Sequence, residues 1–163
     1  MNPYLARIIA LLGKDDPVAS LAAMPQRLEE LLPRLEPDRS YAPGKWTARE
    51  ILCHLADTEL AMGFRFRQTL AQDNHTVQPF DQDAWAARYG GLPIRLAFET
   101  FKALRAWNLA LLRGLSEEDL ERSYYHPERE EWESLRLLVR FWAGHDLNHL
   151  GQLEVIASQS AQG

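Results

Sequence analysis

The sequence predicts an all-α protein, specifically a four-helix bundle with long crossover connections. Apolar residues recur every three or four positions over four long segments, which is the spacing of one helical face. Prolines and glycines fall between these segments rather than within a repeat or a low-complexity tract. Two connections run to roughly twenty residues, whereas helices that simply alternate up and down are joined by short loops. We therefore expect a bundle that includes crossovers.

Length and composition favour a single domain over residues 1–163. The chain is 46% hydrophobic and 25% charged, which suits one globular core, and it is too short for two ordinary domains. No stretch approaches the ~20 consecutive apolar residues of a membrane span, and the first residues lack the features of a signal peptide. We expect a soluble, cytoplasmic protein that does not bind membranes.

Charge and cysteine content narrow the possible partners and the compartment. The formal net charge is −5, so the protein as a whole repels phosphate polymers, and a nucleic-acid partner is not expected. The single cysteine, Cys53, cannot form an intrachain disulfide, which agrees with a reducing compartment. We interpret Cys53 as a small apolar residue of a helix.

The N-terminal part of the chain predicts one short and one long helix. Residues 3–12 form the short helix, which Gly13 and the turn after it interrupt. Pro33 disturbs the last turn of the first long helix. The apolar face of this long helix consists of Leu21, Met24, Leu28, Leu31, Leu32 and Leu35.

The second long helix has the clearest start signal in the sequence. Thr47 is followed three residues later by Glu50, which is the spacing of a capping box, and we extend the helix to about Gln72. One charged residue, Glu59, belongs to its otherwise apolar stripe. The other members of the stripe are Leu52, Leu55, Met62, Phe66 and Leu70.

The remaining helices follow two long connections. The first connection, 73–91, is expected to cross the fold and to hold one helical turn. Pro93 then opens the third long helix, which ends at Gly114. In the second connection Ser116 caps a short helical segment, and the last helix runs over about 134–157.

Two histidines one helical turn apart are the first indication of chemistry. His145 and His149 lie on the same face of the last helix, ~6 Å apart along its axis, on the inner stripe that contains Leu138 and Ile156. Burying a polar ring without a partner costs about 1–3 kcal/mol. The pair therefore requires either hydrogen-bond acceptors, as satisfied core histidines have, or a shared metal ion.

His54 is the natural third ligand. It lies near the start of the second long helix, at the edge of the apolar stripe beside Ile51 and Thr58. An edge position suits the wall of an open pocket. A ferritin-like di-iron site is disfavoured, because no Glu lies three residues before any of the five histidines.

Residues 44–59 together with 145–153 resemble the DinB/YfiT-like family of metal-binding four-helix bundles. The resemblance covers nearly the whole chain and includes 80–83 in the long connection. It implies an up-down-down-up helix order, a homodimer, and one divalent ion held by a histidine of the second helix and two of the last. Residue by residue, these metal ligands are His54, His145 and His149.

Three neutral imidazoles suit zinc, nickel or iron and leave a coordination position for water or substrate. An ion there lowers the pKa of water or of a thiol. Some members of the family use a low-molecular-weight thiol such as mycothiol or bacillithiol as cosubstrate. The resemblance implies the same kind of cosubstrate for this chain. Our first interpretation is a metal-dependent thiol transferase or isomerase for a small-molecule substrate. The alternatives are a metal-dependent hydrolase and a non-catalytic dimeric stress or interaction protein with a structural ion.

Three polar residues near the histidines are secondary candidates. Asp57 lies one turn beyond His54, Gln152 lies three residues beyond His149, and either could orient a ligand or touch the open position. Asp57 is the catalytic candidate. Asp146, in the string His-Asp-x-x-His, is a candidate general base by analogy with the zincin motif. The alternative for each is an ordinary surface or structural role.

Three further residues carry weaker expectations. Asn108 is an amide on the inner stripe of the third helix, where it either hydrogen-bonds in the pocket or serves as a buried structural amide. His75 and His126 fall in the long connections and are expected to be exposed and without a role.

Overall fold

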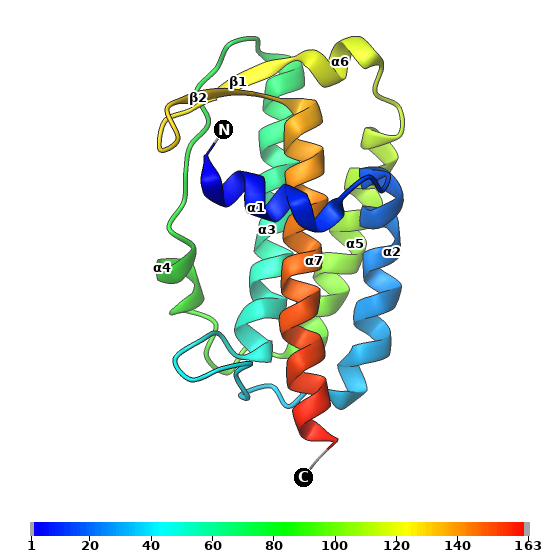
Figure 1. The fold of residues 1–163 in the computed structure, drawn as a ribbon, viewed down its shortest axis with the longest axis vertical. Helices are drawn as coiled ribbons and strands as arrows, with labels where there is room; N and C mark the ends of the chain where they lie inside the picture. The colour runs from blue at the N-terminus through cyan, green and yellow to red at the C-terminus, as the bar shows by residue number, and fades with distance from the viewer. Residues whose placement is uncertain (1, 162–163) are drawn as a thin grey trace.

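The computed structural model describes residues 2–161, in which four long helices pack side by side as a bundle (Figure 1). α2 and α7 run in one direction, and α3 and α5 run in the other (Figure 1). This up-down-down-up order makes the connection between α3 and α5 return along the length of the bundle. The predicted fold class is thereby confirmed. The four helices are α2 (Pro17–Leu31), α3 (Ala48–Ala71), α5 (Ile94–Leu112) and α7 (Leu135–Ser160).

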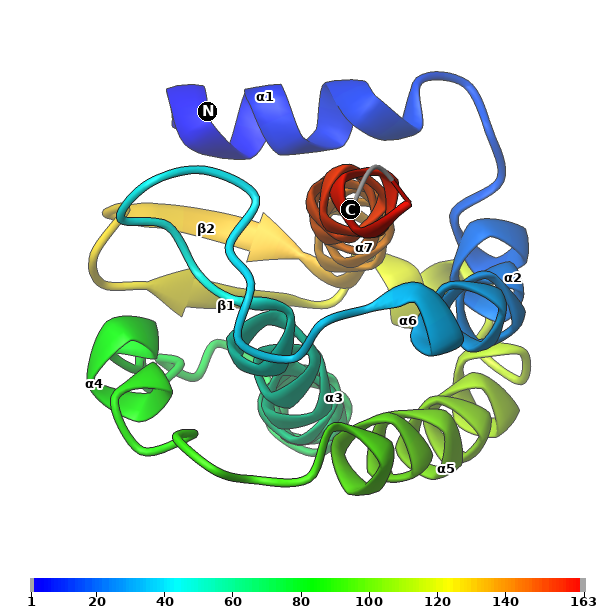
Figure 2. The same ribbon diagram turned by 90° about the horizontal axis from the view of Figure 1, so that it is seen from below.

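The helices form a ring in which α3 packs against α5 and α7, and α2 packs against the same two helices (Figure 2). The short helix α1 (Pro3–Leu12) crosses α7 on the outside of this ring. Gly144 of α7 permits the close approach, because a Cβ atom built there lies 2.2 Å from the backbone oxygen of Ile8. The two helices that later provide the candidate ligands, α3 and α7, are therefore direct neighbours.

Short elements fill the connections between the long helices. They are the 3-10 turn η1 (Leu32–Arg34), α4 (Gln82–Ala86), α6 (Glu117–Glu121) and the antiparallel strands β1 (Ser123–His126) and β2 (Glu131–Ser134). The sequence predicts the helical turns in these connections but not this hairpin. Each strand has four residues, too few for alternation of polar and apolar side chains to stand out in the sequence.

The helix ends follow the local signals in the sequence. At the start of α3 the Thr47 hydroxyl accepts from the Glu50 backbone N–H at 3.2 Å, and Glu50 accepts from the Thr47 N–H at 2.7 Å, which is the predicted capping box. Asp16 caps α2 by accepting from the N–H of Ala19. α2 gives way to the 3-10 turn that contains Pro33, as the sequence indicated.

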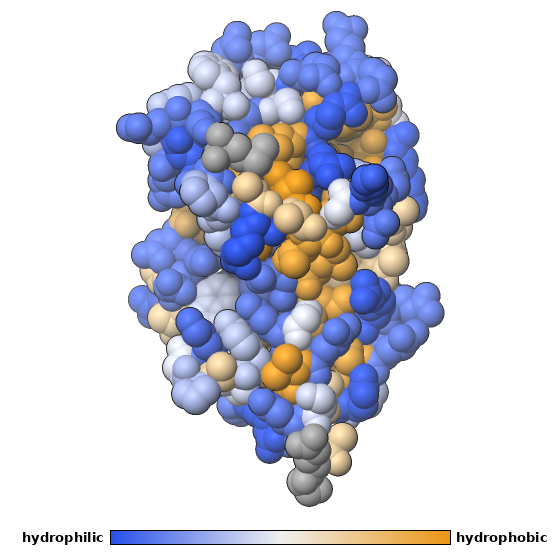
Figure 3. Space-filling view, in the orientation of Figure 1, coloured by the Kyte–Doolittle hydropathy of each residue, from blue (hydrophilic) through white to orange (hydrophobic). Residues whose placement is uncertain are grey.

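The core continues along the whole length of the bundle. One cluster of buried apolar side chains joins the C-terminal half of α2 to the start of α3 and the end of α7, and a second lies beneath α1 and the hairpin. Seen from the side of α1 and α7, apolar atoms form a band between hydrophilic margins (Figure 3). Over residues 2–161, no helix has the length and apolarity to cross a membrane.

Candidate metal centre

The three candidate ligands meet at one point between α3 and α7. The Nε2 atom of His145 lies 2.9 Å from Nε2 of His54 and 3.1 Å from Nε2 of His149. The three rings are almost fully buried, with exposed fractions of 2%, 4% and 7% for His54, His145 and His149. His54 and His145, 91 positions apart in the sequence, thus belong to one cluster with His149, which is the set of residues that the family resemblance implied.

The chemical state of the cluster fits a metal ion. Burial lowers the pKa of His54 to about 3 and that of His149 to about 4, and it holds the pKa of His145 well below its usual range. All three imidazoles are therefore neutral at pH 7, which is the form that binds metals. Tetrahedral coordination at ~2.0–2.1 Å places imidazole nitrogens ~3.3 Å apart, close to the separations in this cluster.

Neighbouring side chains orient two of the rings. The Nδ1–H of His149 donates to Oε1 of Gln152 at 2.7 Å, which leaves the Nε2 lone pair of His149 directed into the cluster. Trp46 lies parallel to the His149 ring with centroids 6.0 Å apart, and its centroid is 4.8 Å from that of His54. Gln152 therefore has the orienting position proposed for it, and Trp46 covers one side of the cluster.

A pocket of about 150 Å³ opens beside the cluster. His54 and His145 line it, so a ligand in the pocket has direct access to the point where the Nε2 atoms converge. The rest of its wall comes from α1, α3, α7, the 79–82 segment and the hairpin, and consists of Tyr4, Thr58, Met62, Arg65, Pro79, Phe80, Gln82, His126, Glu128, Arg129 and Phe141.

Asp146 is not placed as a general base. Its carboxylate accepts from Arg105 through both oxygens, at 2.7 and 3.2 Å, and does not line the pocket. Arg105 also donates to Glu59, the charged member of the α3 stripe, at 3.0 Å from its Nε atom. Asn108 donates to Glu59 as well, so this amide belongs to the buried network and not to the pocket. These ion pairs offset the cost of burying the charged groups in the core.

Asp57, the catalytic candidate, faces α4 and its following turn. Its carboxylate accepts a hydrogen bond from the Tyr89 hydroxyl and is absent from the wall of the pocket. Burial, followed by this contact with Asp57, raises the pKa of Tyr89, which keeps the hydroxyl protonated as the donor. Any influence of Asp57 on the cluster therefore passes through α3 or through the position of the 80–91 segment.

Two histidines expected to be exposed are buried. His75 and His126 have exposed fractions of 9% and 3%. The reason is that residues 75–77 run beside β1, where the Tyr125 N–H donates to the His75 oxygen at 2.9 Å and the Val77 N–H donates to the Tyr125 oxygen at 3.0 Å. His126 lines the pocket together with Arg65, and no pattern in the sequence predicted either residue at the site.

The family model of the DinB superfamily matches residues 19–153. This chain belongs to the DinB superfamily. A relative from Bacillus pumilus, named as a metal-dependent hydrolase, is 31% identical over 140 residues, which cover 83% of this chain and 80% of that protein. A relative of the same name from Oceanobacillus iheyensis is 33% identical over 117 residues, covering 71% of this chain and 67% of its own.

A solved structure shares the fold. YfiT from Bacillus subtilis is described as a metal-dependent hydrolase with an unusual four-helix bundle topology, and it superposes with a TM-score of 0.85 at 24% identity. The superposition covers 91% of this chain and 87% of YfiT. The helix order that the family resemblance implied therefore also occurs in a solved structure of the same fold.

Proposed function

We propose that this protein is a metal-dependent hydrolase of small molecules in which His54, His145 and His149 hold one divalent ion. The observation that carries the proposal is the convergence of three neutral, buried Nε2 atoms at the wall of an open pocket. The names of the DinB relatives from Bacillus pumilus and Oceanobacillus iheyensis support it. Imidazole ligands suit zinc, nickel and iron, and we propose one of these as the ion.

Different residues of the chain have different roles in such a site. Three protein ligands leave a coordination position, and the pocket lies where a substrate would reach it. A bound ion supplies a Lewis acid that polarises a carbonyl and lowers the pKa of water or of a thiol. Gln152 fixes the tautomer of His149, while Met62, Phe80 and Phe141 provide apolar walls that exclude solvent from the reacting bond.

Transfer to a low-molecular-weight thiol is the second candidate, and the positions of the carboxylates favour it. Asp146 is paired with Arg105 and Asp57 with Tyr89. Within the part of the chain that the structure describes, the one carboxylate in the pocket wall is the exposed Glu128. A thiol, with a pKa of about 8.5, is far more acidic than water, so it needs less help from a general base.

The decisive experiment compares the two reactions on one preparation. Protein freed of metal with a chelator is reloaded with zinc, nickel or iron and assayed on esters and amides, with and without bacillithiol, mycothiol or glutathione. Hydrolysis should require the ion and no thiol, and should fall at least 100-fold in His54→Gln, His145→Gln and His149→Gln. His75→Gln is the matched control, because His75 is buried, hydrogen-bonds the backbone oxygen of Gln72 and does not line the pocket at the cluster.

Two outcomes would change the assignment. Turnover that appears only when a thiol is added would replace the hydrolase with the thiol transferase. Full metal stoichiometry in all three histidine variants would show that the ion binds elsewhere and would remove the basis of both candidates.

A further inference from the structure

We propose that the substrate of this pocket carries a carboxylate on an apolar body, and that Arg65 and His126 bind the carboxylate. The inference names a substrate class for the proposed function and rests on it for the identity of the reacting site.

Arg65 is a cation buried in the wall of the pocket. Its exposed fraction is 7%, and within residues 2–161 no Asp or Glu oxygen approaches its guanidinium to 4.0 Å. The fully buried Arg105, in contrast, pairs with two carboxylates, Glu59 and Asp146. Burial of a cation without a paired anion is costly, so a fold keeps one where a ligand supplies the anion.

The buried charges around Arg65 leave this end of the pocket positive, whereas the carboxylate of Glu128 in the same wall is exposed to solvent. Arg129 also lines the pocket, but it is already paired with Glu133 through both oxygens. Tyr124 donates its hydroxyl to the same Glu133 at 2.7 Å and lies beneath the Arg65 guanidinium, 5.8 Å from ring centroid to Cζ. The Glu133 carboxylate is thus bound by Arg129 and Tyr124. Arg65 contributes the positive charge that is not paired with a carboxylate among the described residues.

His126 adds an uncharged donor at the same place. It is 3% exposed, lines the pocket with Arg65, and its buried Nδ1 atom has no hydrogen-bond partner among the described residues. Burial and the nearby Arg129 and Arg65 lower the pKa of His126 to about 4, so the ring is neutral. A guanidinium beside an imidazole N–H is a donor set that matches a carboxylate.

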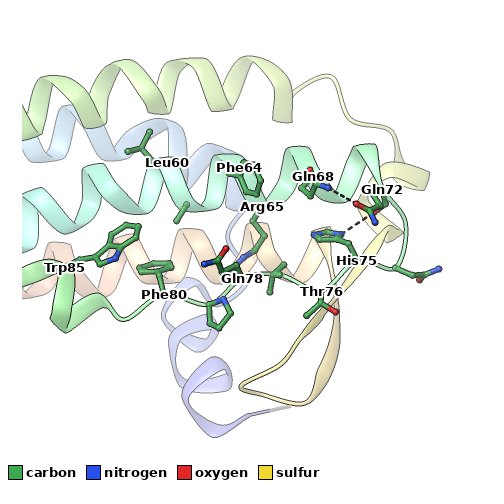
Figure 4. Close-up of a pocket in the computed structure, with 14 residues that line it drawn as sticks. Leu60, Phe64, Arg65, Gln68, Gln72, His75, Thr76, Gln78, Phe80 and Trp85 are labelled. Atoms are coloured by element: carbon green, nitrogen blue, oxygen red, sulfur yellow. Dashed lines mark hydrogen bonds between the residues drawn. The ribbon is translucent and has the colours of Figure 1, made fainter.

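The shape of the surface indicates that the substrate has an apolar body beside its carboxylate. A groove of about 830 Å³ adjoins the pocket, and both cavities are lined by Arg65, Pro79 and Phe80. Figure 4 shows Arg65 extending from α3 toward Gln78, with Phe80 and Trp85 side by side along the groove. The rings of Phe80 and Trp85 are stacked with centroids 4.6 Å apart, and Phe64 on the α3 side is 69% exposed. These apolar side chains, which remain exposed or half-buried, suit an aliphatic or aromatic group.

The spacing of His54 and Arg65 along α3 determines the length of the substrate. His54 and Arg65 lie on one helix about 16 Å apart along its axis, and both side chains reach the same pocket. A substrate that places its reacting bond at the histidines and its carboxylate at Arg65 is therefore an extended acid. The part of its apolar body that extends beyond the pocket lies along Phe80 in the groove.

The test uses hexanoate and its uncharged isostere hexanamide as probes of the full-length protein. Binding is followed by calorimetry and by tryptophan fluorescence, with Trp85 in the groove, on protein freed of metal so that the carboxylate cannot coordinate an ion. Hexanoate should bind wild type at least 10-fold more tightly than hexanamide. Arg65→Gln should weaken hexanoate at least 10-fold and leave hexanamide unchanged, and Arg65→Lys should lie between the two.

Three controls keep the result specific. Arg95→Gln removes the same charge from an exposed position on α5 that lines neither cavity, and hexanoate should bind it as it binds wild type. Arg65→Gln should unfold at a temperature no lower than wild type, because it removes an unpaired buried charge. Hexanamide should bind Arg95→Gln and wild type equally, which shows that this substitution leaves the apolar groove unaltered.

The outcomes separate this inference from the proposed function. Equal binding of hexanoate and hexanamide to wild type, or equal binding of hexanoate to wild type and Arg65→Gln, would overturn the carboxylate site. Absence of any metal-dependent turnover, with hexanoate binding still dependent on Arg65, would overturn the hydrolase and leave the anion site standing.

Discussion

Arg105 binds Asp146 through two hydrogen bonds in the middle of the bundle, where the two side chains are 1% and 2% exposed. The same guanidinium binds Glu59, which also accepts from Trp142 Nε1 at 2.8 Å and from Asn108 Nδ2 at 2.9 Å. The network joins α5 to α3 and α7, the two helices that carry the histidines. Since Asp146 follows the ligand His145 directly, the ion pair also fixes the rotation of α7 at the cluster.

Replacement of Arg105 by Met should cost about 3–5 kcal/mol of unfolding free energy, because it leaves Glu59 and Asp146 buried without a cation. Urea unfolding followed by circular dichroism measures the loss. Arg95→Met, at an exposed position of α5, should stay within about 0.5 kcal/mol of wild type. A loss below 1 kcal/mol in Arg105→Met would show that the network does not stabilise the bundle.

Gln152→Leu should weaken metal binding about 10- to 100-fold without changing its stoichiometry. The reason is that Gln152 accepts from His149 Nδ1 and thereby fixes the ring that presents Nε2 to the ion. Competition with a chromophoric chelator measures the affinity. Gln159→Leu, about 10 Å further along α7, serves as the control. Equal affinities for the two variants would contradict the orienting role.

Asp57→Asn should lower turnover more than it lowers metal affinity, and Tyr89→Phe should do the same. Both substitutions weaken the hydrogen bond that ties the segment after α4 to α3, at a cost of about 0.5–1.5 kcal/mol in stability. The measurement is kcat for metal-loaded protein beside the metal dissociation constant. A strong effect of Asp57→Asn with none for Tyr89→Phe would instead indicate a direct role of the carboxylate.

Two glycines of α7 should respond in opposite directions to alanine. Gly144→Ala places a methyl group 2.2 Å from the Ile8 oxygen, so α1 must move away from α7, at a cost of at least about 1–3 kcal/mol. Gly151→Ala meets no atom within 4 Å and should stabilise the protein by about 0.5–1 kcal/mol through helix propensity. Thermal unfolding of the pair checks both signs, and similar shifts would contradict the close α1–α7 contact.

The metal-free protein should lose stability as the pH falls from 6.5 toward 4. Burial lowers the pKa of His54 to about 3 and that of His149 to about 4, whereas unfolded histidine titrates near 6.5. The unfolded chain therefore binds more protons in this range, and each histidine contributes up to about 1.4 kcal/mol per pH unit. Urea unfolding in the presence of a chelator at pH 7.5, 6.5 and 5.5 measures the slope. His54→Gln/His149→Gln should show a shallower one, and an unchanged slope would contradict the burial of neutral rings.

The sequence alone determined the long helices, most of their ends and the pairing of His145 with His149. These features depend on contacts between residues at most four positions apart, such as the capping box of Thr47 and Glu50 or the one-turn spacing of the two histidines. Periodicity also placed His54 on the wall of a pocket. The family resemblance then supplied the order in which the helices run.

Only the tertiary structure decided which polar groups of different elements meet. It gave Glu59 its partner Arg105 and turned Asp146 away from the pocket, because the positions of α3, α5 and α7 around the core select one set of ion pairs. It buried His126 and brought it to Arg65 through a hairpin whose strands are too short to leave a periodic pattern. Contacts between residues about sixty positions apart depend on how elements pack, and packing free energy is a property of the whole core and not of any local segment.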